Sequence, residues 1–537
     1  MAVRVVTAAA LAAALFAPAA AGPQRHPWTI PHVLRYATTE DVVSLNPHLN
    51  PQVTLSFMSS LAMAWLVRFD RDNRPIPELA TAVPSRANGG ISADGRTITY
   101  HLRRDAKWSD GVPFTSKDVA FTVRVVLDPG NAESSHVGFD KIDRVETPDP
   151  YTVRFRLKQP WAAFYVNFFG SAYAQPCVLP EHLLGKEKSI NQSAYNALPV
   201  GIGPFKYAEW KRGDQVVLVR DPLYFGRKPK LERVVFKIIT DRNTNLTQLR
   251  THEIDMWALV PAAYAARTAE IEGVKVLRQP SFLFSHYDFQ TAHPPLDEIA
   301  VRRALRLATP RAEILEKIRH GIGTLQETPF PPGHPYHIDL PLVPYDPAAA
   351  NRELEAAGWK MGPDGVRVKN GMRLTFTFAS GTGLPDSDAE IELVRDAWKH
   401  IGATFEVRRY PSTLMFAPLA SGGVIQNGKF DIVPFGWLTS PAGDLTNLYS
   451  CDRVPPNGQN DTRWCDRTAD AAMARFDGSY DESVRRAATR TIQERLVAGV
   501  PMMVMYARQD VFAFNDDLHG FHPNHVTYFD DLTDADL

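Results

Sequence analysis

The chain has 537 residues, which is too long for one hydrophobic core and predicts roughly two to four domains. Hydrophobic residues make up 44% of the chain and charged residues 22%, the balance of an ordinary soluble globular protein. Lys and Arg total 59 against 60 Asp and Glu, so there is no basic excess with which to neutralise nucleic-acid phosphates. We therefore expect no nucleic-acid partner.

The first 21 residues have the features of a secretory signal peptide. Arg4 supplies a positive charge, an apolar run covers 5–16, and small residues lead up to a cleavage site near Ala21. A transmembrane anchor is the alternative, but the apolar run is shorter than the ~20 residues that span a bilayer. The first cysteine is Cys177, so no thiol near the cleavage site could carry a lipid. We predict a cleaved signal peptide over 1–21 and a periplasmic protein without a lipid anchor.

The first strong structural signals lie between residues 97 and 127. Polar and apolar residues alternate over 97–102, which predicts a half-buried strand. The sequence SDG at 109–111 predicts a turn. Thr115 and Asp118 resemble a capping box ahead of an apolar helical run over 119–127.

The rest of the chain alternates between predicted helices and strands. A hairpin turn is expected at 212–214. Amphipathic helices are predicted over 345–358, 386–402 and 481–499, and the last two lead into strands, the second of them over 502–506. The third helix is expected to bury one face, made of Val484, Ala488, Ile492 and Leu496. Helices that lead directly into strands indicate mixed α/β domains.

Motifs of catalysis are weak throughout. There is no G-x-S-x-G elbow and no H-E-x-x-H helix, and GIGPFK at 201–206 lacks the third glycine of a dinucleotide loop. We therefore expect a binding protein that is not an enzyme and needs no cofactor. A secreted hydrolase with an unrecognised site is the alternative.

The sequence contains no convincing metal site. The nearest candidates are loop histidines, which we expect to be exposed to solvent: His334, His337, His519, His522 and His525. Cys451 and Cys465 could close a small loop with a disulfide worth roughly 3 kcal/mol, although the sequence leaves their pairing open. Cys177 is then the odd cysteine, expected to be buried.

Several motifs in order resemble one family. SADGRTITYHLRRDAKWSDGVPFTSKDVAFT is similar to the signature region of the extracytoplasmic solute-binding proteins of the peptide/oligopeptide/nickel class of ABC transporters. SLNPHLN, GIGPFKYAEW, EIDMW, HPPLDEIAVRRAL, KFDIVPFGW and VPPNGQNDTRWCD resemble further segments of that family, in the family's order. The resemblance covers the chain from about residue 33 to its C-terminus.

The resemblance implies a two-lobed α/β fold of the large periplasmic-binding-protein type, with an extra domain and a hinge of two strands. The first domain would combine 22–78, 195–290 and 498–537; the second would cover 79–194 and the third 291–497. In this family the signature region is structural, so Trp108 is expected in a core.

The resemblance also implies where a ligand would lie. Peptide binders of this class pair the peptide amine with an aspartate three residues after a Gly-Trp pair, but that place holds Ser440 here. An arginine two residues before the glycine is replaced by Pro434, and Asp444 could substitute for the missing aspartate. The expected ligand-binding residues are Gln52, Val53 and Thr54 in a loop that begins at Pro51, together with Trp257, Trp437, Ser440, Asp444 and Asn460.

The family resemblance implies a receptor that feeds an inner-membrane ABC permease, most simply with di- to oligopeptides. Because both charged anchors differ, a non-peptide ligand stays open: an oligosaccharide, an opine-like compound or a metal chelate. We expect a monomer.

Overall fold

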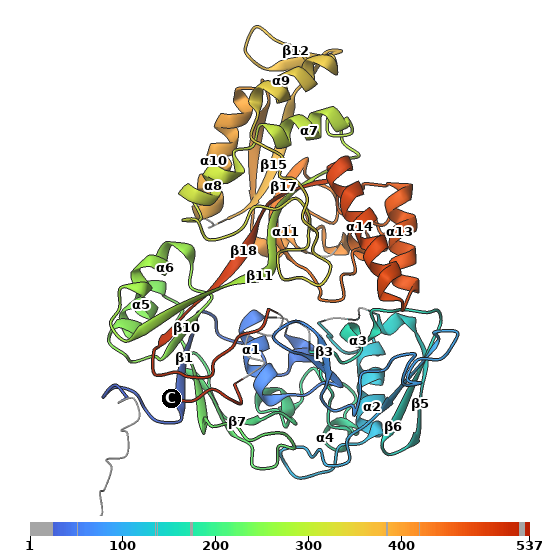
Figure 1. Cartoon of the computed structure of the whole chain (residues 1–537), viewed down its shortest axis with the longest axis vertical. Coiled ribbons are helices and arrows are strands. Elements are labelled where there is room, and N and C mark those ends of the chain that lie inside the picture. Colours follow the sequence, from blue (N-terminus) through green and yellow to red (C-terminus); the bar gives the residue numbers. More distant parts are fainter. Residues whose placement is uncertain are drawn as a thin grey trace, which may run out of the picture.

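The computed structural model describes residues 25–537 except 51, 135, 137, 172–175, 383–384, 418 and 526–531. The predicted signal peptide therefore lies outside the described residues, as does Pro51. Figure 1 shows an upper lobe and a lower lobe joined by two long strands. We use upper lobe for the part with β12–β17 and α7–α14, and lower lobe for the part with β1–β10 and α1–α6.

The main sheet has ten strands within the described residues and combines parallel with antiparallel neighbours. From edge to edge its order is β16 (Thr404–Tyr410), β15 (Thr375–Gly381), β17 (Ile432–Leu438), β11 (Val274–Phe289), β18 (Met502–Asn515), β10 (Met256–Ala258), β1 (Val33–Thr38), β9 (Arg233–Ile238), β8 (Gln215–Arg220) and β7 (Phe205–Lys211). Strand β1 runs parallel to β9 and β10, whereas β7, β8 and β9 form an antiparallel meander. Strands far apart in sequence thus lie side by side.

Strands β11 and β18 run through both lobes (Figure 1). They pair antiparallel over 274–288, but their register shifts between Pro280 and Phe284 and again between Ser285 and His286. Beyond the shift, β11 also pairs with β17 of the upper lobe. The connection between the lobes therefore consists of two strands whose ladder is interrupted at the crossing.

Smaller sheets complete the two lobes. In the lower lobe, β4 (Thr97–His101), β6 (Thr152–Leu157) and β5 (Ile142–Asp149) form one sheet, and β2 (Val67–Phe69) pairs with β3 (Pro75–Pro77). In the upper lobe, a short sheet contains β12 (Lys360–Met361), β13 (Arg367–Lys369) and β14 (Met372–Arg373).

Helices cover the sheets of both lobes (Figure 1). Those of the lower lobe are α1 (Val53–Ala62), α2 (Ser116–Leu127), α3 (Phe164–Asn167), α4 (Glu181–Leu184), α5 (Arg242–Arg250) and α6 (Ala262–Ala269). Those of the upper lobe are α7 (Ile299–Leu307), α8 (Arg311–Lys317), α9 (Pro347–Ala356), α10 (Pro385–Lys399), α11 (Ser412–Met415), α12 (Thr446–Tyr449), α13 (Arg467–Gly478) and α14 (Glu482–Gly499). Short 3₁₀ segments occur at Pro47–Leu49, Phe139–Lys141, Ala194–Ala197 and Leu419–Ser421. Among the described residues, no helix combines the length and apolar character needed to cross a membrane.

The local predictions around residue 115 are confirmed. Strand β4 occupies the predicted alternation, and Gly111 has the positive φ of a turn glycine, 95°. Thr115 caps α2, and the carboxylate of Asp118 accepts a hydrogen bond from the backbone N–H of Thr115 at 2.8 Å. Trp108 is buried in the core of the lower lobe, as expected.

Two later predictions need correction. Val484 on α14 is 39% exposed, because the buried face of the helix is carried by Ala488, Ile492 and Leu496 without it. Strand β18 ends at Asn515, far beyond the predicted 502–506. The polar run from Arg508 to Asp510 interrupts the apolar pattern on which the shorter prediction relied.

Replacing Trp108 tests whether the signature region is structural. Trp108 is 1% exposed, so Trp108→Ala should lower the free energy of unfolding by about 3–5 kcal/mol through loss of packing and creation of a cavity. Thermal unfolding followed by circular dichroism measures the effect. Trp210 on β7 is only partly buried, so Trp210→Ala should cost clearly less; equal losses would contradict the assignment.

Candidate functional site

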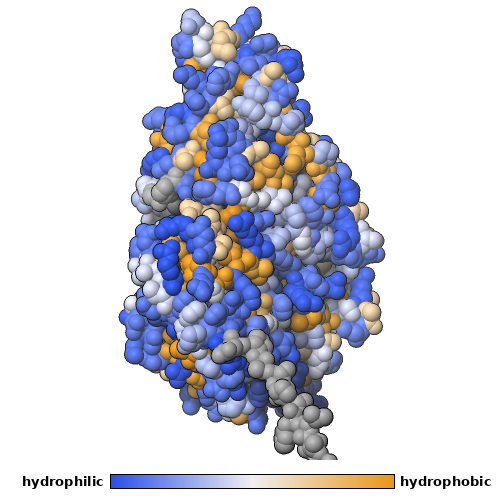
Figure 2. Space-filling view, turned by 60° about the vertical axis from the view of Figure 1, so that its left-hand side comes forward, coloured by the Kyte–Doolittle hydropathy of each residue, from blue (hydrophilic) through white to orange (hydrophobic). Residues whose placement is uncertain are grey.

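A cavity of about 590 Å³ lies where the two lobes meet. The lower lobe lines it with Val53 at the start of α1 and with 259–262 before and into α6. The upper lobe lines it with 434–436 of β17 and with residues of α10 and α11, and β11 and β18 contribute from the crossing. In the view of Figure 2, apolar side chains gather at mid-height, between more polar surfaces above and below. The cavity therefore has walls from both lobes.

One wall of this cavity is a strand edge that has no partner over most of its length. Among the described residues, β15 pairs with β17 only at Ile432, whereas the other side of β17 pairs with β11 along its whole length. The backbone N–H of Thr439 donates to the carbonyl of Phe282 at 3.1 Å, which fixes the alternation of this ladder. By that alternation, Gly436 and Leu438 direct their N–H and C=O groups away from β11. Among the described residues, this stretch of edge is open for a further strand.

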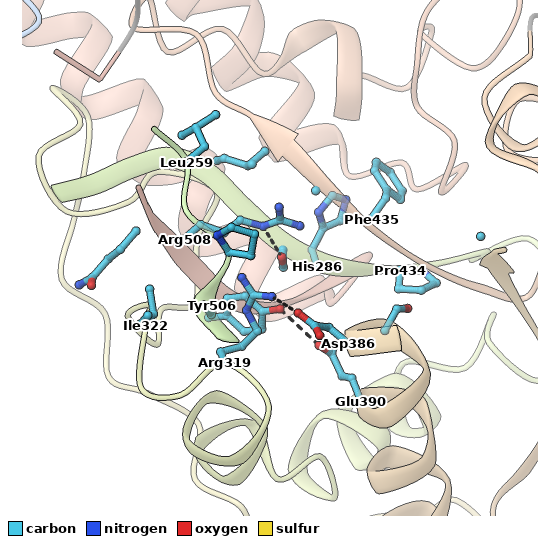
Figure 3. A pocket seen from close by; sticks show the side chains of 18 of the residues that line it. Leu259, His286, Arg319, Ile322, Asp386, Glu390, Pro434, Phe435, Tyr506 and Arg508 are labelled. Carbon is cyan, nitrogen blue, oxygen red and sulfur yellow. Dashed lines mark hydrogen bonds and ion pairs between the residues drawn. The ribbon is translucent and has the colours of Figure 1, made fainter. Parts of the chain in front are cut away.

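A buried carboxyl group ties α10 to the crossing strands. Glu390 accepts hydrogen bonds from the hydroxyls of Tyr287 at 2.7 Å and of Tyr506 at 3.3 Å. Burial raises the pKa of Glu390 above its ordinary value, and the two hydroxyl donors lower it in part. This network fixes one end of the cavity wall (Figure 3).

Arginines from both lobes line the cavity. Arg319, which follows α8, donates to the carboxylate of Asp386 at 3.0 Å. The Nε–H of Arg508 on β18 donates to the hydroxyl of Ser285 on β11 at 3.1 Å (Figure 3). Arg242, the first residue of α5, is exposed at the lower-lobe side of the cavity. The cavity is therefore rich in hydrogen-bond donors.

Two further titratable side chains of the wall are buried. Burial lowers the pKa of His286 to about 3, so its imidazole is neutral at physiological pH. Burial raises the pKa of Asp510 to about 7, although Ser281 and Arg508 oppose this shift. The carboxyl group of Asp510 thus carries less negative charge at neutral pH than that of an exposed aspartate would.

Comparisons with known proteins agree with this architecture. Residues 74–458 match the bacterial extracellular solute-binding proteins, family 5 (middle region). The chain belongs to this family. Protein XP55 of Streptomyces lividans is 32% identical over 81% of the chain and 76% of its own length. A dipeptide-binding protein of Pseudomonas aeruginosa is 27% identical over 85% of the chain and 86% of its own length.

A solved structure shares the fold. The oligopeptide-binding protein AppA of Bacillus subtilis, in complex with a nonapeptide, superposes with a TM-score of 0.77 at 22% identity and covers 94% of this chain and 98% of that chain. The predicted two-lobed fold of the large type is therefore confirmed. Membership also means that the chain is one of a family of extracytoplasmic solute-binding receptors.

The structure places the two predicted tryptophans outside the cavity lining. Trp257 on β10 is 1% exposed and packs edge-on against Tyr264 of α6. Trp437 on β17 is half-buried, packs against the apolar cluster beneath α13 and α14, and contacts Phe435 edge-on. Phe435, one strand position from Gly436, is the aromatic side chain of β17 that does line the cavity.

Residues at the start of α1 divide between structure and cavity. Val53 lines the cavity. Gln52 instead accepts a hydrogen bond from the backbone N–H of Val43 and donates one to the carbonyl of Asp41. The hydroxyl of Thr54 is hydrogen-bonded to the hydroxyl of Thr38.

The upper-lobe loop residues are also held by their own neighbourhood. Asn460 is completely buried and donates to the carbonyls of Ser450 and Trp464. The hydroxyl of Ser440 accepts from the backbone N–H of Ala442. These roles stabilise loops, and a direct role of either residue in ligand binding stays a prediction.

Asp444 lies beside another carboxyl group. Its carboxylate accepts from the backbone N–H of Thr446 at 2.8 Å. Burial, together with the charge of Asp444, raises the pKa of Asp477 on α13 to about 7. Asp444 does not line the cavity described above, so its role as a partner for a peptide amine stays a prediction.

The histidines and cysteines have structural surroundings. His334 is buried, contrary to expectation, because its ring stacks on Phe330 and bonds the carbonyl of Ser440. His519 and His522 are exposed. Cys451 and Cys465 form a disulfide, whereas Cys177 is free and buried.

Sequence reasoning missed the charged groups of the cavity. Arg508 and Asp510 lie two positions apart on β18, so both point to one face of a central strand. Charged side chains on one face of an otherwise apolar strand are the signal that could have indicated them. Ser285 and Glu390 carried no comparable signal.

Replacing Asp477 tests the interaction between its carboxyl group and that of Asp444. With a pKa of about 7 in the folded protein and about 4 in the unfolded chain, Asp477 holds a proton in the folded state that the unfolded chain releases, so the free energy of unfolding falls as pH rises from about 4 to 7. Asp477→Asn should therefore stabilise the protein at pH 8, by at most about 4 kcal/mol, and change little at pH 4. Thermal unfolding at both pH values measures this.

Asp396 on α10 is exposed and provides the control. Asp396→Asn should leave the unfolding temperature unchanged at both pH values. Equal stabilisation by Asp477→Asn at pH 4 and pH 8 would contradict the raised pKa.

Proposed function

We propose that this protein captures di- to oligopeptides between its lobes and delivers them to an inner-membrane ABC permease. The observation that carries the proposal is the open edge of β17 in the wall of the cavity. A peptide that adds to this edge as a strand would be held by backbone hydrogen bonds, which tolerate many side chains. The dipeptide- and oligopeptide-binding relatives support the same ligand class.

Closure of the two lobes is the proposed output of binding. A ligand that touches both lobes binds the closed state better than the open state and so shifts the population toward closure. Val53 of the lower lobe and Gly436 of the upper lobe line one cavity, so a bound peptide would contact both. The permease would then recognise the closed form.

The remaining features of the proposal follow the family. We propose a periplasmic monomer whose signal peptide, residues 1–21, is removed, and which binds its solute without transforming it. We also propose the domain boundaries given above: 22–78, 195–290 and 498–537 for the first domain, 79–194 for the second and 291–497 for the third. Separate apolar cores around Trp108, Phe236 and Trp398 support this division.

A non-peptide ligand is the second candidate. The observation that favours it is that Ser440 and Pro434 occupy the places of the two charged anchors. An opine-like compound or a metal chelate would not need an aspartate for an amine. Mass spectrometry of small molecules that co-purify with the protein distinguishes these classes, and turnover of any of them would favour a hydrolase.

Binding of a peptide library tests the proposed function. Random di- to hexapeptides with free termini should be retained by the purified protein and recovered unchanged. Small-angle scattering should show a smaller radius of gyration with the retained peptides than without them, because the lobes close. An identical scattering profile with and without retained peptides would contradict closure, and retention of none would contradict the peptide ligand.

Tyr480 provides a second test, because it joins the lobes in this structure. Its hydroxyl, between α13 and α14, donates to the carbonyl of Gly95 at 2.9 Å and accepts from the N–H of Trp161 at 3.2 Å. Tyr480→Phe removes these bonds, each worth about 1 kcal/mol, and should weaken peptide affinity several-fold by favouring the open state. Titration calorimetry measures this; unchanged affinity would show that the contact does not stabilise closure.

A further inference from the structure

Arg508 contributes a half-buried guanidinium group to the cavity wall. Arg319 has Asp386 as its partner, and Arg242 is exposed to water. Arg508 is half-buried, yet among the described residues no carboxylate oxygen lies within 4.0 Å of its nitrogens. A partly desolvated charge without an ion-pair partner costs free energy. A guanidinium group in a cavity wall therefore favours a ligand that carries an anionic group.

The neighbouring carboxyl groups do not supply that partner. Glu390 is occupied by the hydroxyls of Tyr287 and Tyr506. Asp510 points to the same face of β18 but is buried, and its pKa of about 7 leaves it partly protonated at neutral pH. Both carboxyl groups lie close enough to interact with the charge of Arg508, but among the described residues neither forms an ion pair with it.

The guanidinium is held in place for contact with a ligand. Its Nε–H is used by Ser285, which pairs with Gly436 across the β11–β17 ladder. A Cβ on residue 436 would lie 3.2 Å from Nη2 of Arg508, so the guanidinium lies against the glycine backbone. Nε is occupied by Ser285, and neither terminal nitrogen forms a hydrogen bond to another described residue, so both can contact a ligand.

The place of this cation matters as much as its charge. Gly436 belongs to the open edge of β17, so Arg508 lies beside the backbone with which a bound strand would pair. An arginine fork matches the two oxygens of a carboxylate. Pro434 occupies the place on β17 where the family resemblance implies an arginine. Arg508 lies on β18, which is separated from β17 by β11.

We propose that Arg508, oriented by Ser285 and Gly436, is a subsite for a carboxylate of the bound ligand. The inference rests on the proposed peptide function, for which the carboxylate is the C-terminus or an acidic side chain. It makes Arg508 a specificity-determining residue: ligands without a carboxylate at this place should bind poorly.

Matched peptide libraries test the subsite. Random di- to hexapeptides without acidic residues are offered to the protein as C-terminal acids and as C-terminal amides, and the retained peptides are quantified by mass spectrometry. The wild-type protein should prefer the acids at least tenfold. A third library of amides that each contain one Asp or Glu separates the two sources, since its retention would assign the subsite to an acidic side chain.

The variants isolate Arg508 from the rest of the protein. Arg508→Gln should abolish the preference for carboxylates, and Arg508→Lys should keep part of it, because the charge stays while the fork is lost. Gly436→Ala keeps the arginine but displaces it, and should reduce the preference even if Arg508→Gln folds poorly. Arg278, exposed on the lower-lobe half of β11, is the matched control, and Arg278→Gln should bind as the wild type does.

The outcomes separate this inference from the proposed function. Equal retention of acids, plain amides and acidic amides by the wild type would overturn the carboxylate subsite and leave the peptide function standing. Retention of no library at all would overturn the peptide function, and the subsite with it. A preference for acids that survives in Arg508→Gln would show that another residue reads the carboxylate.

Discussion

The pairing of β11 with β18 holds the two lobes together and determines how they can move. Each strand is long enough to belong to the sheet of both lobes, so no flexible linker joins them. The register of the ladder shifts between Pro280 and Phe284 and again between Ser285 and His286, so the pairing of the two strands is irregular at the crossing. A change of lobe angle can be taken up there while the flanking sheets stay rigid.

This arrangement also explains the composition of the cavity. Strands that continue from one lobe to the other bring side chains of a buried sheet into contact with the space between the lobes. The polar groups of these strands must then be satisfied by specific partners, as the hydroxyls of Tyr287 and Tyr506 are by the carboxyl group of Glu390. Within the part of the chain that the structure describes, Arg508 donates from only one of its nitrogens, which distinguishes it from the structural groups around it.

The sequence predicted local structure far better than it predicted the site. The cap formed by Thr115 and the alternation over 97–102 depend on neighbours a few residues away. The two-lobed fold was predicted from the family motifs, which occur along this chain in the same order as in the family.

The site could not be read in the same way because it is assembled over long sequence distances. Its walls come from α1, β11, α10, β17 and β18, and no local pattern shows which face of these elements meets the cavity. Trp257 illustrates the difficulty: an aromatic residue on a three-residue strand can face a ligand or a helix, and here it faces α6. Asn460 resembles an exposed loop residue in the sequence, yet it organises the loop from within.

The proline at position 434 has a consequence for how β17 reads an extended guest. Proline has no N–H, so along the outward side of this strand the first available donor is that of Gly436 and the next is that of Leu438. A chain laid against the strand can therefore change its alignment only in steps of two residues, which keep the same set of its side chains on the same side. Under the proposed function, strand β17 would therefore fix the register of a bound peptide, so that alternate residues of the peptide face the same wall of the cavity.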